Sequence, residues 1–593
     1  MCGITAIFAY RSNAAGVRSE ELNAITESMR ARGPDAGGTW ISTDARVGIG
    51  ARRLAIIDLS AEGTQPMFDV ERELVIAFNG EIYNYRELCA SLERGGARFH
   101  SHTDTEVLLR LYRRDGERML GLLRGMYAFV IWDTRARRMF VARDPYGIKP
   151  LYVSDDGGTI RIASEVKALL AGGAVSRAVD PAGVAGFFLT GSVPEPFTIR
   201  EAVRAVEAGT AFHVDEERGR GDVLRHESVA RVFRRASMQR PTAHLTQAGV
   251  ALRERIEESV AHHLVADVPI GVFLSSGIDS SALAAIASRL SREPLHTFTL
   301  AFEEFRGRHG DEAPLAERFA REIGAIHTTR IVTREEFHAD LPNFLAAMDQ
   351  PTIDGVNTWF VSKAAHEAGI KVVLSGLGGD ELLGGYPSFA NIPTMMRLAR
   401  TPLAWLMSFS RHPKKRLLRE YGGTYAGAYL LQRGLFLPHE VCVECGNASC
   451  RCRSVEKRRL ASPHSTLDIL ERFEAAIDPD PGTPFGRIAS LEASLYMRNQ
   501  LLRDADWTSM AHSVEVRTPF VDIALLRQIA PLVLEYRETG KRVLGSMLPP
   551  WLRDRPKTGF FVPIREWMDL PPDGTTTRMR SWARSVFEAT AGA

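Results

Sequence analysis

The second residue of this chain, Cys2, is the first whose chemistry points to catalysis. If the initiator methionine is removed, Cys2 carries both a thiol and a free α-amine. The reference pKa of an α-amine is about 7.7–8.0, so the amine can act as general base for the thiol of the same residue. Such a nucleophile attacks carbonyl carbons. The alternative interpretation is that Cys2 is a small buried hydrophobic residue.

Attack on a carbonyl requires hydrogen-bond donors that stabilise the developing oxyanion. Asn79 and Gly80 stand at the end of a predicted strand and can provide a side-chain amide and a backbone N–H. An amino-acid substrate also needs partners for its charged ends. Arg53 can grip an α-carboxylate through two hydrogen bonds, and Glu81 or Asp104 can accept an α-ammonium.

Two loops rich in serine and glycine form a second candidate site. Residues 274–281 lie between a predicted strand and a predicted helix, where backbone N–H groups bind phosphate. Residues 374–381 repeat this arrangement after a later strand. Asp279 and Asp380 could share the Mg²⁺ that neutralises a leaving pyrophosphate. Taken alone, residues 274–281 could also be an ordinary turn, and the chain contains no kinase-type Walker motif.

The first half of the chain resembles the glutaminase domain of class II amidotransferases. The matching segments, in the order found in that family, are residues 1–4, 32–35, 53–58, 78–84 and 143–152. The resemblance implies an αββα N-terminal-nucleophile fold that hydrolyses glutamine to glutamate and ammonia. It implies Cys2 as nucleophile, Asn79 and Gly80 as oxyanion hole, and these glutamine ligands: Arg53, Leu54, Ala55, Ile56, Ile57, Asn79, Gly80, Glu81 and Asp104.

The second half resembles the synthetase domain of asparagine synthetases, which has a phosphate-binding loop of the ATP pyrophosphatase type. The supporting segments are residues 267–271, 510–522 and 555–560. The resemblance implies transfer of AMP to a carboxylate with release of pyrophosphate. Ammonia that travels through an internal tunnel then displaces AMP.

The same resemblance implies roles for single residues of this half. Lys541 matches a late catalytic lysine, although on its own it could be an exposed lysine. Asp279 and Asp380 are the implied magnesium ligands. The implied ATP contacts are Leu274, Ser275, Ser276, Gly277, Asp279, Ser280, Leu300, Ser375 and Gly376.

Three departures from the asparagine synthetase pattern bear on the carboxylate acceptor. Ser276 replaces the first glycine of the phosphate loop but keeps a small donor, so we expect activity to survive. Leu377 stands where asparagine synthetases carry a glutamate, and leucine cannot accept a proton. Residues 349–358 contain aspartates where aspartate-binding residues are expected, and an aspartate there would repel a substrate carboxylate. The reaction type is therefore better defined than the acceptor.

A separate cluster of four cysteines has the spacing C-x₂-C-x₄-C-x-C: Cys442, Cys445, Cys450 and Cys452. Two thiolate pairs could hold Zn²⁺ in a tetrahedral site. The spacing is short for a zinc ribbon, so unligated surface thiols or an occasional disulfide are the favoured interpretation.

The elements that must position these residues follow two patterns. Before residue 216, short strands and turns alternate with few helices, one of which begins near Thr103. After residue 245, strands at 270–274, 296–302 and 370–374 alternate with loops and helices, which predicts a parallel α/β sheet. We expect four segments: a glutaminase domain at 2–215, a linker at 216–244, an ATP-binding domain at 245–570 and a tail at 571–593 with one short surface helix.

Composition limits the classes of function. A chain of 593 residues suffices for two to four domains, and 74 Lys and Arg against 72 Asp and Glu give a net charge of +2. That balance provides no overall field for nucleic acid or an anionic membrane. No apolar run is long enough to span a bilayer, and no signal peptide is evident, so we expect a cytoplasmic protein with reduced cysteines. The basic run at 411–416 indicates a solvated helix start.

The leading hypothesis is a glutamine-dependent amide synthetase that consumes ATP, uses Mg²⁺ and makes asparagine from aspartate by default. The enzyme alternative applies the same chemistry to another carboxylate. The non-enzyme alternative is a scaffold that binds glutamine or ATP without turnover, and only Leu377 favours it. The expected partners are small-molecule substrates, with neither nucleic acid nor membrane, and a homodimer is an open alternative.

Overall fold

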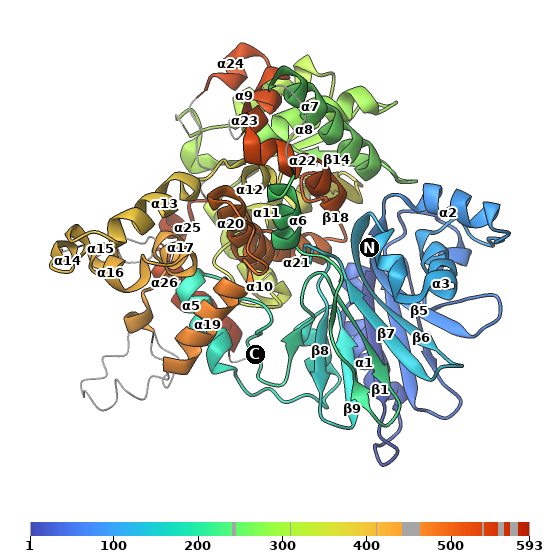
Figure 1. Cartoon of the computed structure of the whole chain (residues 1–593). Coiled ribbons are helices and arrows are strands. Elements are labelled where there is room, and N and C mark those ends of the chain that lie inside the picture. Colours follow the sequence, from blue (N-terminus) through green and yellow to red (C-terminus); the bar gives the residue numbers. More distant parts are fainter. Residues whose placement is uncertain are drawn as a thin grey trace.

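The computed structural model describes residues 2–239, 245–308, 310–410, 412–441, 463–536, 539–555, 562–569 and 579–591. Three β-sheets organise this part of the chain. Two are antiparallel and come from the first 225 residues, and the third is parallel and begins at residue 270. Figure 1 shows the antiparallel sheets at the lower right, with the helices around the parallel sheet filling the rest of the molecule.

The two N-terminal sheets face each other, and the strand order is β10-β8-β9-β1-β3-β2 in one and β12-β11-β7-β6-β5-β4 in the other. The first contains β1 (Cys2–Ala9), β2 (Ala36–Ile41), β3 (Val47–Arg53), β8 (Tyr152–Asp155), β9 (Thr159–Ala163) and β10 (Arg204–Ala205). The second contains β4 (Met67–Phe68), β5 (Leu74–Ile82), β6 (Gly125–Asp133), β7 (Arg138–Arg143), β11 (Thr210–Asp215) and β12 (Gly219–Arg220), and β13 (Leu224–Arg225) pairs with β11.

Apolar side chains fill three layers of this half. Between the sheets, Phe8 packs in one cluster with Val130 and Trp132 of the opposite sheet. Both faces of β1 and β5 are buried, which explains why these strands are apolar almost without interruption. The outer faces are covered by α1 (Ser19–Ser28) and α4 (Val166–Ala171) on one side and by α2 (Tyr85–Arg94) and α3 (Asp104–Asp115) on the other. This αββα sandwich confirms the predicted fold of the first half.

The third sheet is parallel throughout, in the order β16-β15-β14-β17-β18. Its strands are β14 (Ile270–Phe273), β15 (His296–Phe302), β16 (Ile326–Val332), β17 (Val372–Leu374) and β18 (Glu515–Arg517). The predicted strand at 296–302 matches β15 residue for residue. The helix predicted to follow residues 274–281, which we call the serine loop, begins earlier, because α8 (Ile278–Leu290) starts inside that loop. The predicted parallel α/β domain is confirmed.

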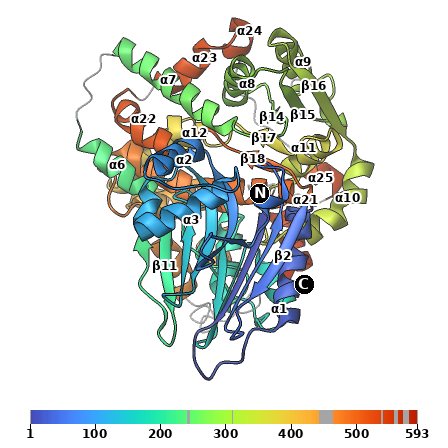
Figure 2. The ribbon, with the colours of Figure 1, turned by 90° about the vertical axis from the view of Figure 1, so that its right-hand side faces the viewer.

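Helices lie on both faces of the parallel sheet, as the turned view in Figure 2 shows. The helices that follow the linker, in addition to α8, are α7 (Leu245–His263), α9 (Ala313–Glu322), α10 (Arg334–Ala347), α11 (Val356–Glu367), α12 (Gly379–Leu383), α13 (Ser388–Ala399), α14 (Leu403–Met407), α15 (Pro413–Arg416), α16 (Leu418–Tyr421), α17 (Tyr425–Arg433), α19 (Pro463–Ala475), α20 (Pro484–Leu491), α21 (Arg503–Ala511), α22 (Ile523–Glu535), α23 (Thr539–Ser546), α24 (Pro550–Arg553) and α25 (Ile564–Trp567). Of these, α13 to α16 pack on one another away from the sheet. A π-helical stretch, Glu492–Leu502, joins α20 to α21. None of the helices in the described ranges combines the length and apolar character needed to cross a bilayer.

The segment expected as a linker, 216–244, carries more structure than its polar start indicates. Strands β12 and β13 extend the second sheet, and α6 (Val229–Ser237) buries Val229, Val232 and Phe233 in one core cluster with residues of α22. These residues have helical spacing, which the polar residues before them obscure in the sequence.

The C-terminal tail differs from its expected surface position. Helix α26 (Arg580–Ala591) forms, but Trp582, Ala583 and Val586 are fully buried. Phe587 stacks against Phe187 of α5 (Pro181–Thr190) with ring centroids 6.3 Å apart. Helix α26 is therefore part of the core, because its apolar face finds a partner 400 residues earlier in the chain.

Candidate active sites

The predicted nucleophile, Cys2, begins β1 and is 5% exposed. Its backbone N–H donates to Asn79 Oδ1 over 3.0 Å. Burial raises the pKa of the Cys2 thiol, and the positive charges of the chain's amino terminus and of Arg53 oppose that rise. A thiol in this environment needs a base close by to form the thiolate, which is the role expected for a liberated α-amine.

The two candidate oxyanion donors lie together on β5. Asn79 is fully buried, and its Nδ2 has no hydrogen-bond partner among the described residues. Since the Cys2 N–H fixes the oxygen of the same amide, this donor is held beside the nucleophile. Gly80 has a φ of +154°, and a Cβ there would lie 2.1 Å from the Met126 carbonyl oxygen, so only glycine fits.

Arg53 shapes the loop that follows it. Its guanidinium donates to three carbonyl oxygens within residues 57–60. The other domain holds the same loop through Asp267, whose N–H donates to the Ile56 carbonyl over 3.0 Å. The Asp58 N–H in turn donates to Asp267 Oδ2 over 2.8 Å. The predicted glutamine contacts at 54–57 therefore lie at a boundary that both domains build.

The candidate ammonium ligands, Glu81 and Asp104, are both buried. Burial raises the pKa of Asp104 to about 6, and its Oδ2 accepts the Ile82 N–H over 2.9 Å. Burial, followed by the charge of Glu515, raises the pKa of Glu81 well above its usual value, and Arg517 lies 3.5 Å away. A bound ammonium would favour ionisation of both carboxyls.

Sequence reasoning missed Gln65. Its Nε2 lies 3.9 Å from the Cys2 sulfur and 3.4 Å from Thr105 Oγ1, while its Oε1 accepts the Phe78 N–H over 2.7 Å. The side chain is therefore held against the thiol from two sides. A single glutamine has no motif around it, so only the fold reveals this position.

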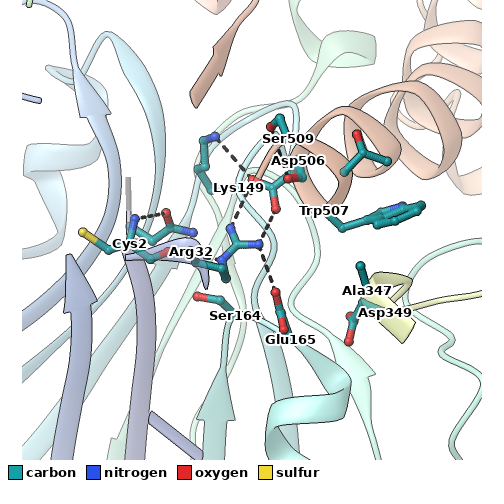
Figure 3. A network of polar contacts seen from close by, with 12 residues as sticks. Cys2, Arg32, Lys149, Ser164, Glu165, Ala347, Asp349, Asp506, Trp507 and Ser509 are labelled. Atoms are coloured by element: carbon teal, nitrogen blue, oxygen red, sulfur yellow. Dashed lines mark hydrogen bonds and ion pairs between the residues drawn. The ribbon is translucent and has the colours of Figure 1, made fainter. Parts of the chain in front are cut away.

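Arg32 connects the nucleophile to the second domain, as Figure 3 shows. Its Nε donates to the Cys2 carbonyl oxygen over 3.3 Å, and its Nη1 lies 2.7 Å from Asp506 Oδ2. Lys149 Nζ lies 3.4 Å from Asp506, and Glu165 lies 3.3 Å from Arg32. All four charged side chains are buried. Burial opposes ionisation of Asp506, but the charges of Arg32 and Lys149 hold its pKa below the usual value.

A cavity of about 550 Å³ lies at the carboxyl ends of β14 and β17. The nine residues predicted to contact ATP all line it, together with Asp380 and Lys541: Leu274, Ser275, Ser276, Gly277, Asp279, Ser280, Leu300, Ser375 and Gly376. The serine loop is held by its own side chains, since Ser275 Oγ and Ser280 Oγ are 2.7 Å apart. The N–H groups of residues 275–277 donate to side chains of the protein, and α8 begins at Ile278 on the cavity lining. The N-terminal end of a helix binds phosphate well.

Two carboxylates converge on one ammonium inside this cavity. Lys541 Nζ lies 2.6 Å from both carboxylate oxygens of Asp279 and 2.6 Å from Asp380 Oδ1. Gly379 and Gly385 make this approach feasible, because a Cβ at Gly385 would meet Asp380 Oδ1 at 1.9 Å. The two carboxylates thus follow the ends of two strands that are 101 residues apart in the chain.

The structure places the residues that depart from the asparagine synthetase pattern. Leu377 lines the cavity, whereas neither Asp349 nor Asp354 does. Asp349 instead accepts the N–H groups of residues 166 and 167 in the first domain. Asp354 accepts from Gln500 Nε2 over 3.3 Å. Neither aspartate lines the cavity, and repulsion of an acceptor by this segment stays a prediction. The four cysteines at 442–452 lie outside the described residues.

Helix α21 runs between the two sites. Ala505 lines the cavity, and the next residue, Asp506, holds Arg32 and through it the carbonyl of Cys2. A single helical turn therefore contacts both centres. Any shift of this helix changes the surroundings of the nucleophile and of the cavity together.

Comparison with known proteins gives results for both halves. The glutamine amidotransferase domain family matches residues 1–223, and the asparagine synthase family matches residues 251–588. A Mycobacterium tuberculosis protein whose name places it with the glutamine-hydrolysing asparagine synthetases is 35% identical over 96% of this chain and 88% of its own length. Glutamine-hydrolysing asparagine synthetase 1 of Bacillus subtilis is 31% identical over 99% of this chain and 90% of its own length.

Other similar proteins carry different names. Amidase chry2 of Gibberella zeae is 31% identical over 96% of this chain and 90% of its own length. Among solved structures, glutamine phosphoribosylpyrophosphate amidotransferase of Bacillus subtilis is similar with a TM-score of 0.30 and 18% identity, over 56% of this chain and 81% of that one. From the two family matches and the near full-length similarity to curated relatives, we conclude that the chain belongs to the glutamine-hydrolysing asparagine synthetase family, whose members are glutamine-dependent ligases.

Proposed function

We propose that this protein hydrolyses glutamine at Cys2 and uses the ammonia to amidate a carboxylate that ATP activates in the 550 Å³ cavity. The observation that carries the proposal is the link through α21. One helix contacts the cavity through Ala505 and anchors the strand of Cys2 through Asp506 and Arg32. Two sites joined in this way suit a reaction in which the product of one is consumed at the other.

The first half-reaction rests on Cys2. After removal of Met1, the α-amine takes the thiol proton and the sulfur attacks the side-chain amide of glutamine. Asn79 Nδ2 and the Gly80 N–H donate to the oxyanion, and the unpartnered state of Nδ2 supports this role. Collapse of the tetrahedral intermediate releases ammonia, and water then hydrolyses the thioester to glutamate.

In the second half-reaction the cavity residues hold ATP while an acceptor carboxylate attacks its α-phosphate. The first N–H groups of α8 bind phosphate oxygens, and Lys541 supplies positive charge near the departing pyrophosphate. Ammonia then attacks the acyl-adenylate carbon and AMP leaves. Burial of Asp506, Arg32 and Lys149 between the centres keeps bulk water from this region, which preserves ammonia as the free base.

Asp279 and Asp380 suit a magnesium site. Both already face one cation, Lys541, at 2.6 Å. Within the described residues no group of three or more His, Cys, Asp or Glu could hold a metal, so the protein would supply two carboxylates and the nucleotide or water would complete the shell, as is usual for Mg²⁺. When bound, Mg²⁺ would neutralise charge on the leaving pyrophosphate.

Aspartate is the default acceptor, and a less polar carboxylate is the second candidate. Leu377 favours the second candidate, because it places an apolar side chain on the cavity wall at the position of a family glutamate. The amidase name of one relative also leaves the acceptor open. Asn357 and Thr358, which line the same cavity, are available to hydrogen-bond either acceptor.

One reaction mixture tests the proposal. It contains ATP, Mg²⁺, glutamine and aspartate, and asparagine, AMP and glutamate are quantified together. Asparagine formed in step with AMP would support aspartate as the acceptor. Glutamate without AMP would support the glutaminase site and exclude aspartate, and a panel of other carboxylates would follow. If neither glutamate nor AMP forms, the proposed function is contradicted.

A further inference from the structure

Four large apolar side chains are exposed together on one short helix and the turn after it. They are Leu403 at 47%, Trp405 at 54%, Leu406 at 58% and Phe409 at 73% exposure, and we call them the apolar tip. The described chain has fifteen such exposed side chains, and these four lie within seven consecutive residues. Single exposed apolar residues are ordinary, whereas a contiguous group marks an interaction surface.

The apolar tip is a built feature. Ala404 of α14 is 2% exposed and anchors the helix, while its neighbours point outward. The Trp405 and Phe409 rings pack edge to face with centroids 5.3 Å apart. Figure 1 shows α14 at the left edge of the molecule, with α15 and α16 beside it and the two antiparallel sheets on the opposite side. A flat surface could therefore approach the tip without meeting the first domain.

Basic residues lie on the helices that pack beside the tip. Residues 382–419 contain seven Lys and Arg and no Asp or Glu. Five of these cations, which we call the basic collar, are exposed on α13, α15, α16 and the turn after α13: Arg397, Arg400, Lys415, Arg416 and Arg419. An overall charge of +2 averages over 593 residues and hides this local excess. The expectation of no membrane partner rests on that average.

We propose that the apolar tip and the basic collar dock this protein on the surface of an anionic lipid membrane. Helices that lie in the membrane interface carry tryptophan, phenylalanine and leucine on one face and lysine and arginine on the polar face. The apolar side chains enter the boundary of the acyl chains, and the collar attracts anionic headgroups. The contact is peripheral and reversible.

Charge and side-chain type select this partner over two others. A second copy of the chain would bring one basic collar against another, which is repulsive. Single-stranded nucleic acid would stack on aromatic rings, but Leu403 and Leu406 offer no ring to a base. A lipid surface accepts all four side chains of the tip and all five cations of the collar.

Sedimentation of the full chain with vesicles tests the proposal. The protein is mixed with vesicles of phosphatidylglycerol and phosphatidylcholine, or with vesicles of phosphatidylcholine alone, at low and high salt. We expect binding to the anionic vesicles that weakens with salt. The double variant Trp405→Gln with Phe409→Gln should lower the partition coefficient by more than about tenfold, because two large apolar groups no longer enter the lipid. Lys415→Glu with Arg416→Glu should lower it by at least about twenty-fold, from roughly fivefold for each lost cation.

Matched controls use equally exposed positions elsewhere. Met238→Gln removes an apolar side chain that is 68% exposed, and Arg94→Glu reverses an exposed cation on α2. Both should bind vesicles as the wild type does, and the unfolding temperature of every variant checks the fold. No binding of the wild type to anionic vesicles would overturn the proposal. Three other results would overturn it as well. Vesicle binding could fall equally in Met238→Gln, the protein could bind an oligonucleotide instead of vesicles, or the tip variants could disrupt a dimer of the wild type.

Discussion

The buried ion pair between Arg32 and Asp506 predicts how the two domains depend on each other. Asp506→Ala removes the carboxylate that Arg32 and Lys149 share, at 2.7 and 3.4 Å. Both cations then stay buried at the domain boundary without that partner. The variant should lose stability and should also lose glutaminase activity, for two separate reasons.

The stability effect follows from the local charges. Removing one partner of a buried ion pair costs about 3–5 kcal/mol, since the other charge is left uncompensated. Two features favour the lower end of this range. Glu165 remains 3.3 Å from Arg32, and burial already lowers the pKa of Lys149, which eases its deprotonation. We expect the free energy of unfolding to fall by about 3 kcal/mol.

The catalytic effect follows from the hydrogen bond between Arg32 and Cys2. Without Asp506, the guanidinium loses two of its hydrogen bonds, and Glu165 alone pulls it away from the position where its Nε meets the Cys2 carbonyl. A displacement of about 1 Å at a reacting group can cost about 10²-fold in rate. The kcat/KM for glutamine should therefore fall by about 10²-fold, while synthesis from free ammonia should change much less.

The assay compares glutamine hydrolysis, ammonia-dependent synthesis and denaturant unfolding in matched variants. Asp522→Ala is the control, because Asp522 lies 2.7 Å from Arg124 in another buried ion pair between the domains. It should lose comparable stability without a selective loss of glutaminase activity. An unchanged kcat/KM for glutamine in Asp506→Ala would refute the positioning role. A selective glutaminase loss in both variants would show that domain contact in general, and not Arg32, is responsible.

Three further predictions concern single residues. Cys2→Ala should abolish glutamine-driven synthesis and leave synthesis from ammonia intact, since the cavity is built by the other domain; glutamine hydrolysis persisting in this variant would contradict the assignment. Asp279→Asn should lower pyrophosphate release by at least about 10²-fold while glutamine hydrolysis continues, because a carboxylate that faces Lys541 at 2.6 Å is lost. Unchanged ATP turnover would show that the loop has another role. Burial lowers the pKa of His263 to about 3. Below about pH 6.5, His263 therefore takes up a proton in the unfolded chain but not in the folded protein. The free energy of unfolding should fall by about 2 kcal/mol between pH 7 and pH 5. Denaturant unfolding of His263→Gln should show a shallower pH dependence over this range, and an equal slope in both proteins would disprove the assignment.

Much of the fold and both candidate sites could be predicted from sequence because their determinants are local. Alternating and continuous apolar runs mark strands such as β15, which the pattern predicts residue for residue. Asp279 and Asp380 lie in the first turns of α8 and α12, a few residues after the short apolar strands β14 and β17. Parallel strands bring their carboxyl ends to one edge. Asn79 and Gly80 were identifiable because they belong to a short motif, and the structure places them inside the antiparallel strand β5 rather than at its end.

Tertiary structure alone decided how these pieces meet. Arg32 and Asp506 are 474 residues apart, and no local pattern on either side reveals that they pair or that the pair holds Cys2. The same is true of Gln65 beside the thiol, of Asp349 turned toward the first domain, and of the tail helix buried against α5. Propensity and periodicity act over a few turns of chain, whereas burial and charge pairing depend on which surfaces the complete fold brings together.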